Sequence, residues 1–392
     1  MSDGRVYGMG FDALVEPDWP ALTSGEVEAV LGTDAAITWR SPRPLSATAR
    51  VRLLDGHEVI LKRLPRTLRD TAALDEEHRF MAHLRARGIP VPQVPTTVDL
   101  GEFAYEVQEL GHGSDEYAGV FSWTPYHSRA EAAAAGRMLA RLHLAAAGYD
   151  APARPPRPLL AGFTIFDSAD PVAAVADRAR RRPALGRFLA ERDWRGDMER
   201  VHLPAHERLY PMLAELEPLW THNDWHGTNL LWRDGEVATV IDFGLCDRTT
   251  AIHDLATAIE RCAVDWISLR DGGPAHVRFD QIEALLQEYQ SVRNLTAAER
   301  QALPALLPLV HCEYELSEID YFLDVVPGGN AKNAEIAYAE YFLGHTAWWT
   351  ESRAGRAAAN TISQLTNIST DTTTYVRADP REDIGRPRKC RE

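Results

Sequence analysis

Apolar residues recur at two different spacings along the chain, and these predict two regions of different structure. Residues 20–34 carry a Ser/Thr cap, a following Glu and a closing Gly, which predicts a first helix. From residue 35 apolar and polar residues alternate, and Asp55-Gly56 separates two such runs as a hairpin turn. A helix is expected over 69–88 and a further strand over 102–111. These elements predict a small β-rich lobe with one main helix.

Beyond residue 111 the apolar residues recur mainly at helical spacing. The expected helical stretches are 130–148, 254–267, 282–292, 306–326 and 335–349. An Arg-rich stretch over 176–200 is interpreted as a solvated helical surface. The segment from Asn367 lacks apolar periodicity and is expected to be disordered. The pattern thus predicts an α+β protein with an N-terminal lobe (1–110), a helical C-terminal lobe (111–366) and a tail (367–392).

The composition limits which binding partners and which cellular compartment are expected for the protein. No apolar run approaches the ~18 residues of a membrane span, and no signal-peptide pattern opens the chain, so no membrane partner is expected. The four cysteines are scattered without metal or disulfide spacing, which fits the cytoplasm. A net charge of −15 repels nucleic acid and suits, without requiring, a cationic ligand. Nothing in the sequence fixes the oligomeric state.

The stretch THNDWHGTNLLWRDGEVATVIDFG, residues 221–244, holds the candidate chemistry. Two strand-like runs follow Asn229 and are joined by a turn at Asp234-Gly235, so Asn229 and Asp242 are expected side by side. Two oxygen ligands at one point suit Mg²⁺, which keeps waters and phosphate oxygens as its other ligands. With Asp224 facing the same space as a base, the set fits phosphoryl transfer.

Two other interpretations of this stretch compete with that one. His222 and His226 stand four residues apart, as zinc ligands of a hydrolase do, but no third ligand follows at a recognisable spacing. Alternatively, the histidine is a packed core residue and the carboxylates cap loops. The hairpin between Asn229 and Asp242 favours phosphoryl transfer over both.

The combined pattern resembles a known family. H-x-D-x₄-N, a hairpin, Asp242-Phe243-Gly244 and then Asp254-Leu255-Ala256 are similar to the motifs of aminoglycoside phosphotransferases and choline-kinase-like small-molecule kinases, over roughly residues 35–350. The resemblance implies a bilobal protein-kinase-like fold and an ATP:alcohol O-phosphotransferase that uses Mg²⁺, with GTP left open as the donor. It implies that Asp224 accepts or orients the substrate hydroxyl and that Asn229 and Asp242 bind metal. It also implies that His222 and Asp254 brace the catalytic loop.

The resemblance also assigns a nucleotide site in the N-terminal lobe. Lys62 on the second hairpin strand would bind phosphates, and Glu77 on the following helix would be its partner. The chain departs from kinases in having no Gly between residues 41 and 54, so Ser46 is the candidate there. The hinge that contacts adenine through its main chain would consist of Glu106, Val107, Gln108 and Glu109.

The acceptor is expected between the catalytic loop and the C-terminal helices. Tyr314, Glu318 and Tyr321 share one helical face, and Trp225 and His226 lie within the catalytic loop. The same face would equally suit a buried polar network between helices. Candidate acceptors are an aminoglycoside or other amino sugar, choline, an amino acid derivative, or another antibiotic, for which antibiotic resistance would be the role. A Ser/Thr side chain of a biosynthetic peptide, or a catalytically silent nucleotide-binding scaffold, are the alternatives.

Overall fold

The computed structural model describes residues 18–41, 45–270 and 276–367. The predicted disordered tail therefore lies outside the described residues, apart from Asn367, which is the last residue of a helix. Among the described residues, no helix has the length and apolar character needed to cross a membrane. Cys246, Cys262 and Cys312 are buried free thiols, as the scattered spacing predicted, and Cys390 lies outside the described residues.

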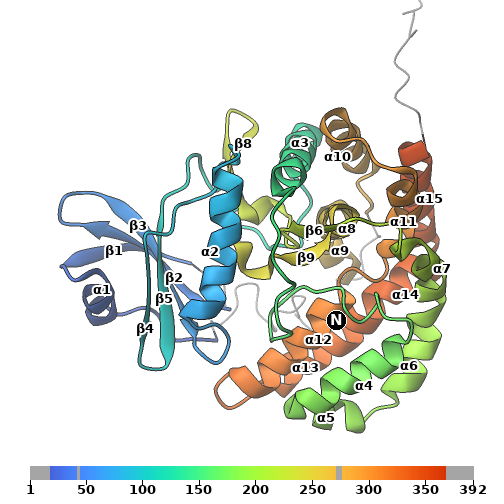
Figure 1. The fold of residues 1–392 in the computed structure, drawn as a ribbon, viewed down its shortest axis with the longest axis horizontal. Helices are drawn as coiled ribbons and strands as arrows, with labels where there is room; N and C mark the ends of the chain where they lie inside the picture. The colour runs from blue at the N-terminus through green and yellow to red at the C-terminus, as the bar shows by residue number, and fades with distance from the viewer. Residues whose placement is uncertain (1–17, 42–44, 271–275, 368–392) are drawn as a thin grey trace, which may run out of the picture.

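The N-terminal region is a five-stranded antiparallel sheet in the order β1-β2-β3-β5-β4, with helix α2 beside it (Figure 1). Gly56, with φ of 87°, closes the predicted β2–β3 hairpin. Helix α1 begins at a Thr23–Glu26 capping box and ends at Gly32, as predicted. The elements are α1 (Ser24–Leu31), β1 (Ala35–Arg40), β2 (Ala47–Leu53), β3 (Glu58–Pro65), α2 (Thr71–Arg85), β4 (Thr96–Leu100) and β5 (Phe103–Glu109).

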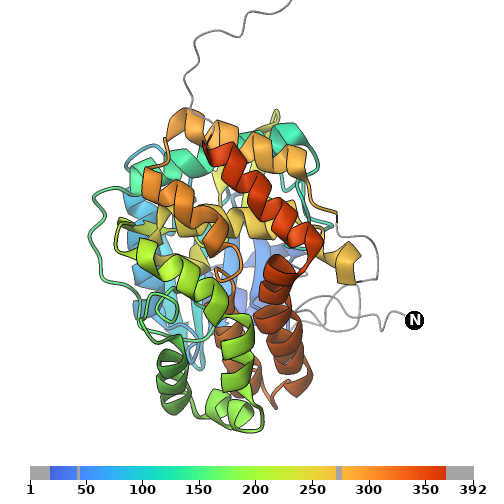
Figure 2. The same cartoon turned by 90° about the vertical axis from the view of Figure 1, so that its right-hand side faces the viewer.

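The remainder of the described chain is mainly helical, with two small sheets next to the N-terminal region (Figures 1 and 2). The strands are β6 (Pro218–Thr221), β7 (Leu230–Arg233), β8 (Glu236–Val240) and β9 (Asp247–Thr250), and β6 pairs with β9 and β7 with β8. The helices are α3 (Arg129–Ala146), α4 (Pro171–Arg181), α5 (Pro183–Ala190), α6 (Trp194–Val201), α7 (Leu203–Leu213), α8 (Ala251–Ala263), α9 (Trp266–Arg270), α10 (Phe279–Val292), α11 (Ala297–Leu306), α12 (Cys312–Asp320), α13 (Ala331–Ile336), α14 (Gly344–Glu351) and α15 (Arg353–Asn367). The predicted α+β class is therefore confirmed.

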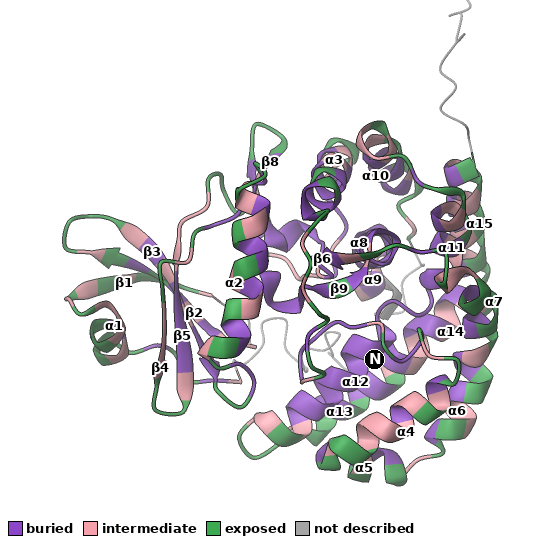
Figure 3. Ribbon diagram, viewed as in Figure 1, coloured by how far each residue is buried: buried purple, intermediate pink, exposed green. Residues whose placement is uncertain are grey.

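Helix α8 forms the centre of the helical region. Every residue from Ala251 to Ala263 is buried, so polar side chains on α8 are held within the interior (Figure 3). Thr250 caps the helix by accepting a hydrogen bond from the backbone of His253, as the sequence predicted for Thr249 or Thr250. Because it is fully buried, α8 is a rigid support for the side chains of Asp254 and Arg261, which are described below.

The predicted helix over 306–326 is interrupted. Helix α12 ends at Asp320, and residues Tyr321–Val325 form a π-helical turn, η3. A second π-helical turn, η4 (Ala337–Leu343), lies between α13 and α14. Because a π turn contains more residues than an α turn, it changes which side chains share a face beyond Asp320.

Candidate active site

The β7–β8 hairpin places Asn229 and Asp242 at the same end of a small sheet. Leu230 pairs with Val240, and the backbone N–H of Ile241 donates to the carbonyl of Asn229 at 3.0 Å. The turn uses Asp234 and Gly235, both with positive φ (54° and 76°), as a tight hairpin requires. The predicted proximity of Asn229 and Asp242 is therefore confirmed.

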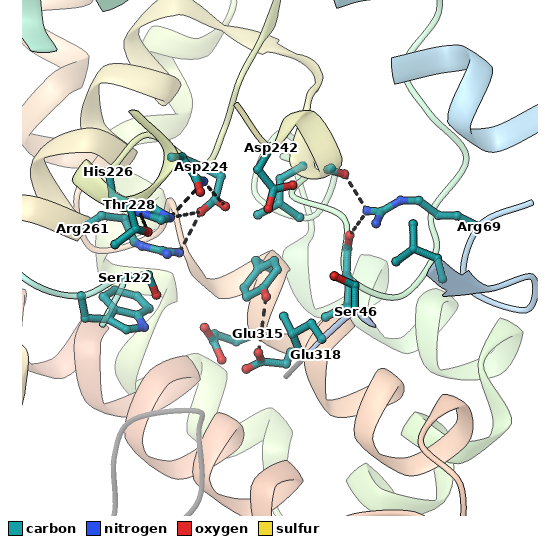
Figure 4. A pocket seen from close by; sticks show the side chains of 18 of the residues that line it. Ser46, Arg69, Ser122, Asp224, His226, Thr228, Asp242, Arg261, Glu315 and Glu318 are labelled. Carbon is teal, nitrogen blue, oxygen red and sulfur yellow. Dashed lines mark hydrogen bonds and ion pairs between the residues drawn. The ribbon is translucent and has the colours of Figure 1, made fainter. Parts of the chain in front are cut away.

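Asp224 lies between an amide, an imidazole and a guanidinium in the loop after β6 (Figure 4). Asn229 Nδ2 donates to its Oδ2 at 2.8 Å, while His226 Nε2 and Arg261 Nη1 each lie 3.2 Å from its Oδ1. Burial alone would raise the pKa of Asp224, but the attraction of His226 and Arg261 outweighs it and holds that pKa well below its usual range. Asp224 is therefore a carboxylate at neutral pH.

Backbone hydrogen bonds fix the loop that carries Asp224. Asp254, on α8, accepts from the backbone N–H of His222 at 3.0 Å and of Asn223 at 2.9 Å. His222 accepts from the backbone N–H of Asp224 at its Nδ1 (3.2 Å), and its Nε2 lies 3.0 Å from the carbonyl of Ile241. If Nδ1 accepts, Nε2 carries the proton and donates to that carbonyl. Both side chains thus bind the loop backbone, where the resemblance placed them.

Lys62 reaches the site from strand β3 and contacts Asp242. Its Nζ lies 3.2 Å from Asp242 Oδ1, and Asp242 has the left-handed φ of 57° at the start of the Phe243–Leu245 turn. The charge of Lys62 lowers the pKa of Asp242, against burial. Burial disfavours the charged form of Lys62, yet Asp242 and the neighbouring acids raise its pKa overall. The pair is thus fully ionised.

Lys62 forms its direct ion pair with Asp242 rather than with Glu77, the expected partner, although the charge of Glu77 still acts on Lys62 and helps to raise its pKa. Glu77 is 5% exposed and pairs instead with Arg69 at 2.9 Å and Arg154 at 2.7 Å. Arg69 and Arg154 also donate to the carbonyl of Gly244, at 2.6 and 3.1 Å, and so fix the turn after Asp242. Two guanidinium groups satisfy the buried carboxylate, and Lys62 forms its ion pair with Asp242. Arg154 comes from a proline-rich connector without a motif, so nothing in the sequence pattern indicated it.

One cavity contains most of the predicted site, and it extends from Lys62 to helix α12 (Figure 4). Arg69 lies on the side of Asp242, Ser46 lies between Asp242 and Glu318, and Glu315 and Glu318 of α12 form the opposite side (Figure 4). Tyr314 of α12 also lines the cavity. The predicted residues that line it are Ser46, Lys62, Asp224, His226, Asn229, Asp242, Tyr314 and Glu318.

Trp225 and Tyr321, which the sequence placed at the acceptor, do not line this cavity. Trp225 is fully buried with its ring edge-on to His222, 5.7 Å away, and is a core residue. Tyr321 accepts a hydrogen bond from Trp19 Nε1 at 2.9 Å and donates to Asp18 at 3.0 Å. The Tyr321 hydroxyl is held by groups outside this cavity, so the i+7 spacing from Tyr314 does not bring it into the lining.

Two buried carboxylates form the acceptor end of the cavity. Glu315 and Glu318 are 1% and 6% exposed; the imidazole of His311 contacts Glu315, and Tyr314 donates to Glu318 at 3.4 Å. Burial raises the pKa of Glu318 to about 7. Burial and the charge of Glu318 together raise the pKa of Glu315 well above its usual range. This end can bind a cation, because a positive charge would stabilise both carboxylates.

The sequence analysis missed Arg261 and Glu315. Arg261 lies seven residues after Asp254, on the same face of α8, and its guanidinium is 4.3 Å from the ring centre of Trp123. That spacing was a usable signal. Glu315 gave none, because every residue of α12 is buried and no polar face stands out.

The side chains of the predicted hinge contact other groups. Glu106 pairs with His78 at 2.8 Å, Glu109 with His57 at 2.9 Å, and Gln108 donates to Glu106 at 2.8 Å. Val107 is buried in the core of the sheet. A main-chain contact with a nucleotide base at these positions stays a prediction.

Comparisons with known proteins agree with this geometry. Residues 43–295 match the model of the phosphotransferase enzyme family. A homoserine kinase from Polaromonas naphthalenivorans is 31% identical over 237 residues, 58% of this chain and 64% of that protein, so the match spans just under two thirds of its length. A homoserine kinase from Azorhizobium caulinodans is 28% identical over 64% of this chain and 70% of its own. The solved structure of amicoumacin kinase in complex with AMP-PNP, Ca²⁺ and Ami superposes with a TM-score of 0.50 at 13% identity, covering 84% of this chain and 88% of that one, and so supports the fold.

Proposed function

The chain belongs to the phosphotransferase enzyme family, and we propose that it is a kinase that transfers the γ-phosphoryl group of ATP to a hydroxyl of a small, amine-bearing alcohol. The observation that carries the proposal is the composition of one cavity. An ionised Asp224, the cation of Lys62 and the carboxylate of Asp242 lie at one end, and the carboxylates of Glu315 and Glu318 lie at the other. The first group suits phosphates and a hydroxyl, and the second suits an ammonium group.

The donor set at the hairpin end fits Mg²⁺. Asp242 has a side chain that is 46% exposed and faces the cavity. The amide nitrogen of Asn229 turns toward Asp224, so its carbonyl oxygen is the atom left for a cation. Carboxylate and amide oxygens are the ligands Mg²⁺ takes, with phosphate oxygens and water completing its shell. A bound Mg²⁺ supplies charge neutralisation on the phosphates.

Asp224 acts on the acceptor hydroxyl. Because its pKa is held low, the carboxylate stays ionised and accepts a hydrogen bond from that hydroxyl, which orients the oxygen toward the phosphate. Lys62 donates to phosphate oxygens, and the Arg69–Glu77–Arg154 cluster holds the backbone of Gly244 next to Asp242. Phosphoryl transfer has a loose transition state, so this positioning and charge neutralisation account for most of the catalysis.

The acceptor end supports an amine on the substrate. Burial raises the pKa of Glu315 and of Glu318 although the charge of Arg261 acts on both, and a ligand ammonium that contacts them would further stabilise their ionised forms. The relatives named homoserine kinases point to an amino alcohol of small size. Homoserine, with one amine and one primary hydroxyl, is thus the first acceptor to test.

The test is an ATP-consumption assay with Mg²⁺ on the full chain. Acceptors are homoserine, serine, choline, amino sugars and aminoglycosides, each beside a neutral alcohol of similar size, and the Asp224→Asn variant serves as the blank. We expect turnover with at least one amine-bearing alcohol, and none with its neutral counterpart. Turnover that persists in Asp224→Asn, or equal turnover with neutral alcohols, would refute the proposal.

A further inference from the structure

A second cavity lies on the other side of helix α12 from the catalytic one. It has a volume of about 300 Å³, against about 170 Å³ for the catalytic cavity, so it has room for a small molecule. Its walls are the connector after residue 155, helix α4 and helix α12, which lie near one another in Figure 1. Its apolar floor includes Ile165, Leu185 and Leu316.

The charge of this cavity is opposite to that of the protein. The chain carries a net charge of −15, yet four arginines and only two aspartates line this cavity. The arginines are Arg157, Arg178, Arg181 and Arg182, and the aspartates are Asp177 and Asp320. Three of these arginines belong to the Arg-rich stretch that was interpreted as a solvated surface, and the beginning of that stretch lines a cavity instead.

Two of these arginines form ion pairs with buried carboxylates, and the other two pair with carboxylates that are only partly buried. Arg178 pairs with Glu313 at 2.7 Å, and Arg182 forms an ion pair with Asp320; both carboxylates come from α12 and are buried, so these pairs hold α4 against α12. Arg157 and Arg181 reach the cavity from two different elements, and their partners are only partly buried.

The guanidinium groups of Arg157 and Arg181 keep donors available beside their present partners. Arg157 pairs with Glu76, whose side chain is 26% exposed and which also has Arg154 as a partner. Arg181 is 70% exposed and pairs with Asp177 one turn earlier on α4. The Arg181 pair is exposed and therefore weak, whereas the Arg157 pair, with side chains 17% and 26% exposed, is partly buried. Each guanidinium has five N–H donors, so an anion can bind without displacing every existing partner.

We propose that this second cavity is a binding site for a small anion, in which Arg157 and Arg181 bind a phosphate or carboxylate group and the floor accepts an apolar portion. The planar guanidinium fork matches both oxyanions, and two such forks from separate elements converge on one hollow. The proposal does not depend on the kinase reaction, because it assigns a ligand to a different cavity.

The two cavities share structural elements. Leu159, a non-glycine residue with φ of 50°, lines the catalytic cavity, while Pro156, Arg157 and Thr164 of the same connector line the second. Ser317, in the second cavity, hydrogen-bonds the backbone of Leu160 at 3.4 Å. An anion in the second cavity therefore contacts the connector and the helix that also form the catalytic cavity.

Isothermal titration calorimetry of the full chain with inorganic phosphate and, separately, with succinate tests this site. We compare the wild type with Arg157→Gln/Arg181→Gln and with the matched control Arg180→Gln/Arg200→Gln. Arg180 and Arg200 are exposed and outside the cavity lining, so the control removes the same charge from the surface. We expect at least one of the two anions to bind with an affinity about tenfold or more lower in the first variant and unchanged in the control.

Titrations of two further variants, Lys62→Met and Arg181→Gln, distinguish the remaining outcomes. Phosphate also suits the catalytic cavity, so Lys62→Met is titrated too: binding lost there but kept in Arg157→Gln/Arg181→Gln overturns the proposal. Equal binding in the wild type and both double variants, or binding of neither anion, also overturns it. If the double variant fails to fold, Arg181→Gln, at a site that is 70% exposed, is expected to weaken binding by about threefold, and unchanged binding there counts against the site.

Discussion

The two ends of the catalytic cavity differ in how charge is arranged. At the phosphate end, opposite charges meet: Lys62 contacts Asp242, and Arg261 contacts Asp224. At the acceptor end, two acids meet, because Glu315 and Glu318 are both buried on one helix. The pKa values of the acids are lowered at the first end and raised at the second.

This difference indicates what each end contributes. The phosphate end is satisfied within the protein and is ready for chemistry without a ligand. The acceptor end is electrostatically incomplete, and a cationic group on the acceptor would complete it. We therefore expect substitutions at the first end to lower kcat and substitutions at the second to change acceptor binding, stability or both.

The largest effect is expected at Asp224. Asp224→Asn keeps the shape of the side chain and removes its charge, so the acceptor hydroxyl loses its proton acceptor. We expect kcat to fall by about 10²–10⁴-fold while nucleotide affinity changes little. Steady-state kinetics beside titration of an ATP analogue would separate the two quantities. A variant that kept kcat within threefold would remove Asp224 from the reaction.

Glu315 tests the acceptor end. Glu315→Gln keeps volume and removes one carboxylate, so an acceptor ammonium loses a charged hydrogen bond worth roughly 1.5–3 kcal/mol. We expect KM for the amine-bearing acceptor to rise about 10–100-fold with kcat within threefold. KM for ATP serves as the internal control. A fall in kcat at unchanged acceptor KM would instead place Glu315 at the phosphate end.

The phosphate end of the cavity could be predicted from the sequence more fully than the acceptor end. Asp224, Asn229 and Asp242 lie within twenty residues, and a two-strand hairpin with a recognisable turn brings them together, so local patterns sufficed. The N-terminal sheet and the cap of α8 were predictable for the same reason.

Long-range pairing and burial were not predictable in this way. The partner of Glu77 depends on Arg154, which only the tertiary fold brings to it. Helix α12 is buried on all sides, so no periodic pattern separated Glu315, which lines the cavity, from Tyr321, which does not. The change to π-helical winding at Tyr321 leaves no signal in spacing rules that assume 3.6 residues per turn.

Arg261 connects the charge at the phosphate end of the cavity to the pH dependence of kcat. Arg261→Met removes a guanidinium that helps to keep the pKa of Asp224 low, so that pKa rises. Because the base acts when ionised, the acidic limb of the kcat profile should move to higher pH, with a larger loss of kcat at the acidic end of the profile than at pH 8. Arg261→Lys, which keeps the charge, should restore most of the profile. A uniform loss at all pH values would mean that Arg261 acts through packing against Trp123.

The smallest effect is expected on the stability of the folded protein, through Glu318 at the acceptor end. Here the loss of an acid is expected to stabilise the protein, whereas the substitutions above lower its activity. The pKa of Glu318 is about 7 in the folded protein against an ordinary value of 4.5 in an unfolded chain, so between these values the folded chain binds more protons than the unfolded one. Its contribution to the free energy of unfolding therefore falls as pH rises through that window. Glu318→Gln cannot ionise, so we expect it to be more stable than the wild type at pH 8, by roughly 1–3 kcal/mol, with a smaller difference at pH 5. Urea unfolding at the two pH values measures this, with the exposed Glu28→Gln as control. A wild type that is the more stable at pH 8 would show that Glu318 already has its cationic partner within the chain, and the argument for an ammonium on the acceptor would lose its electrostatic basis.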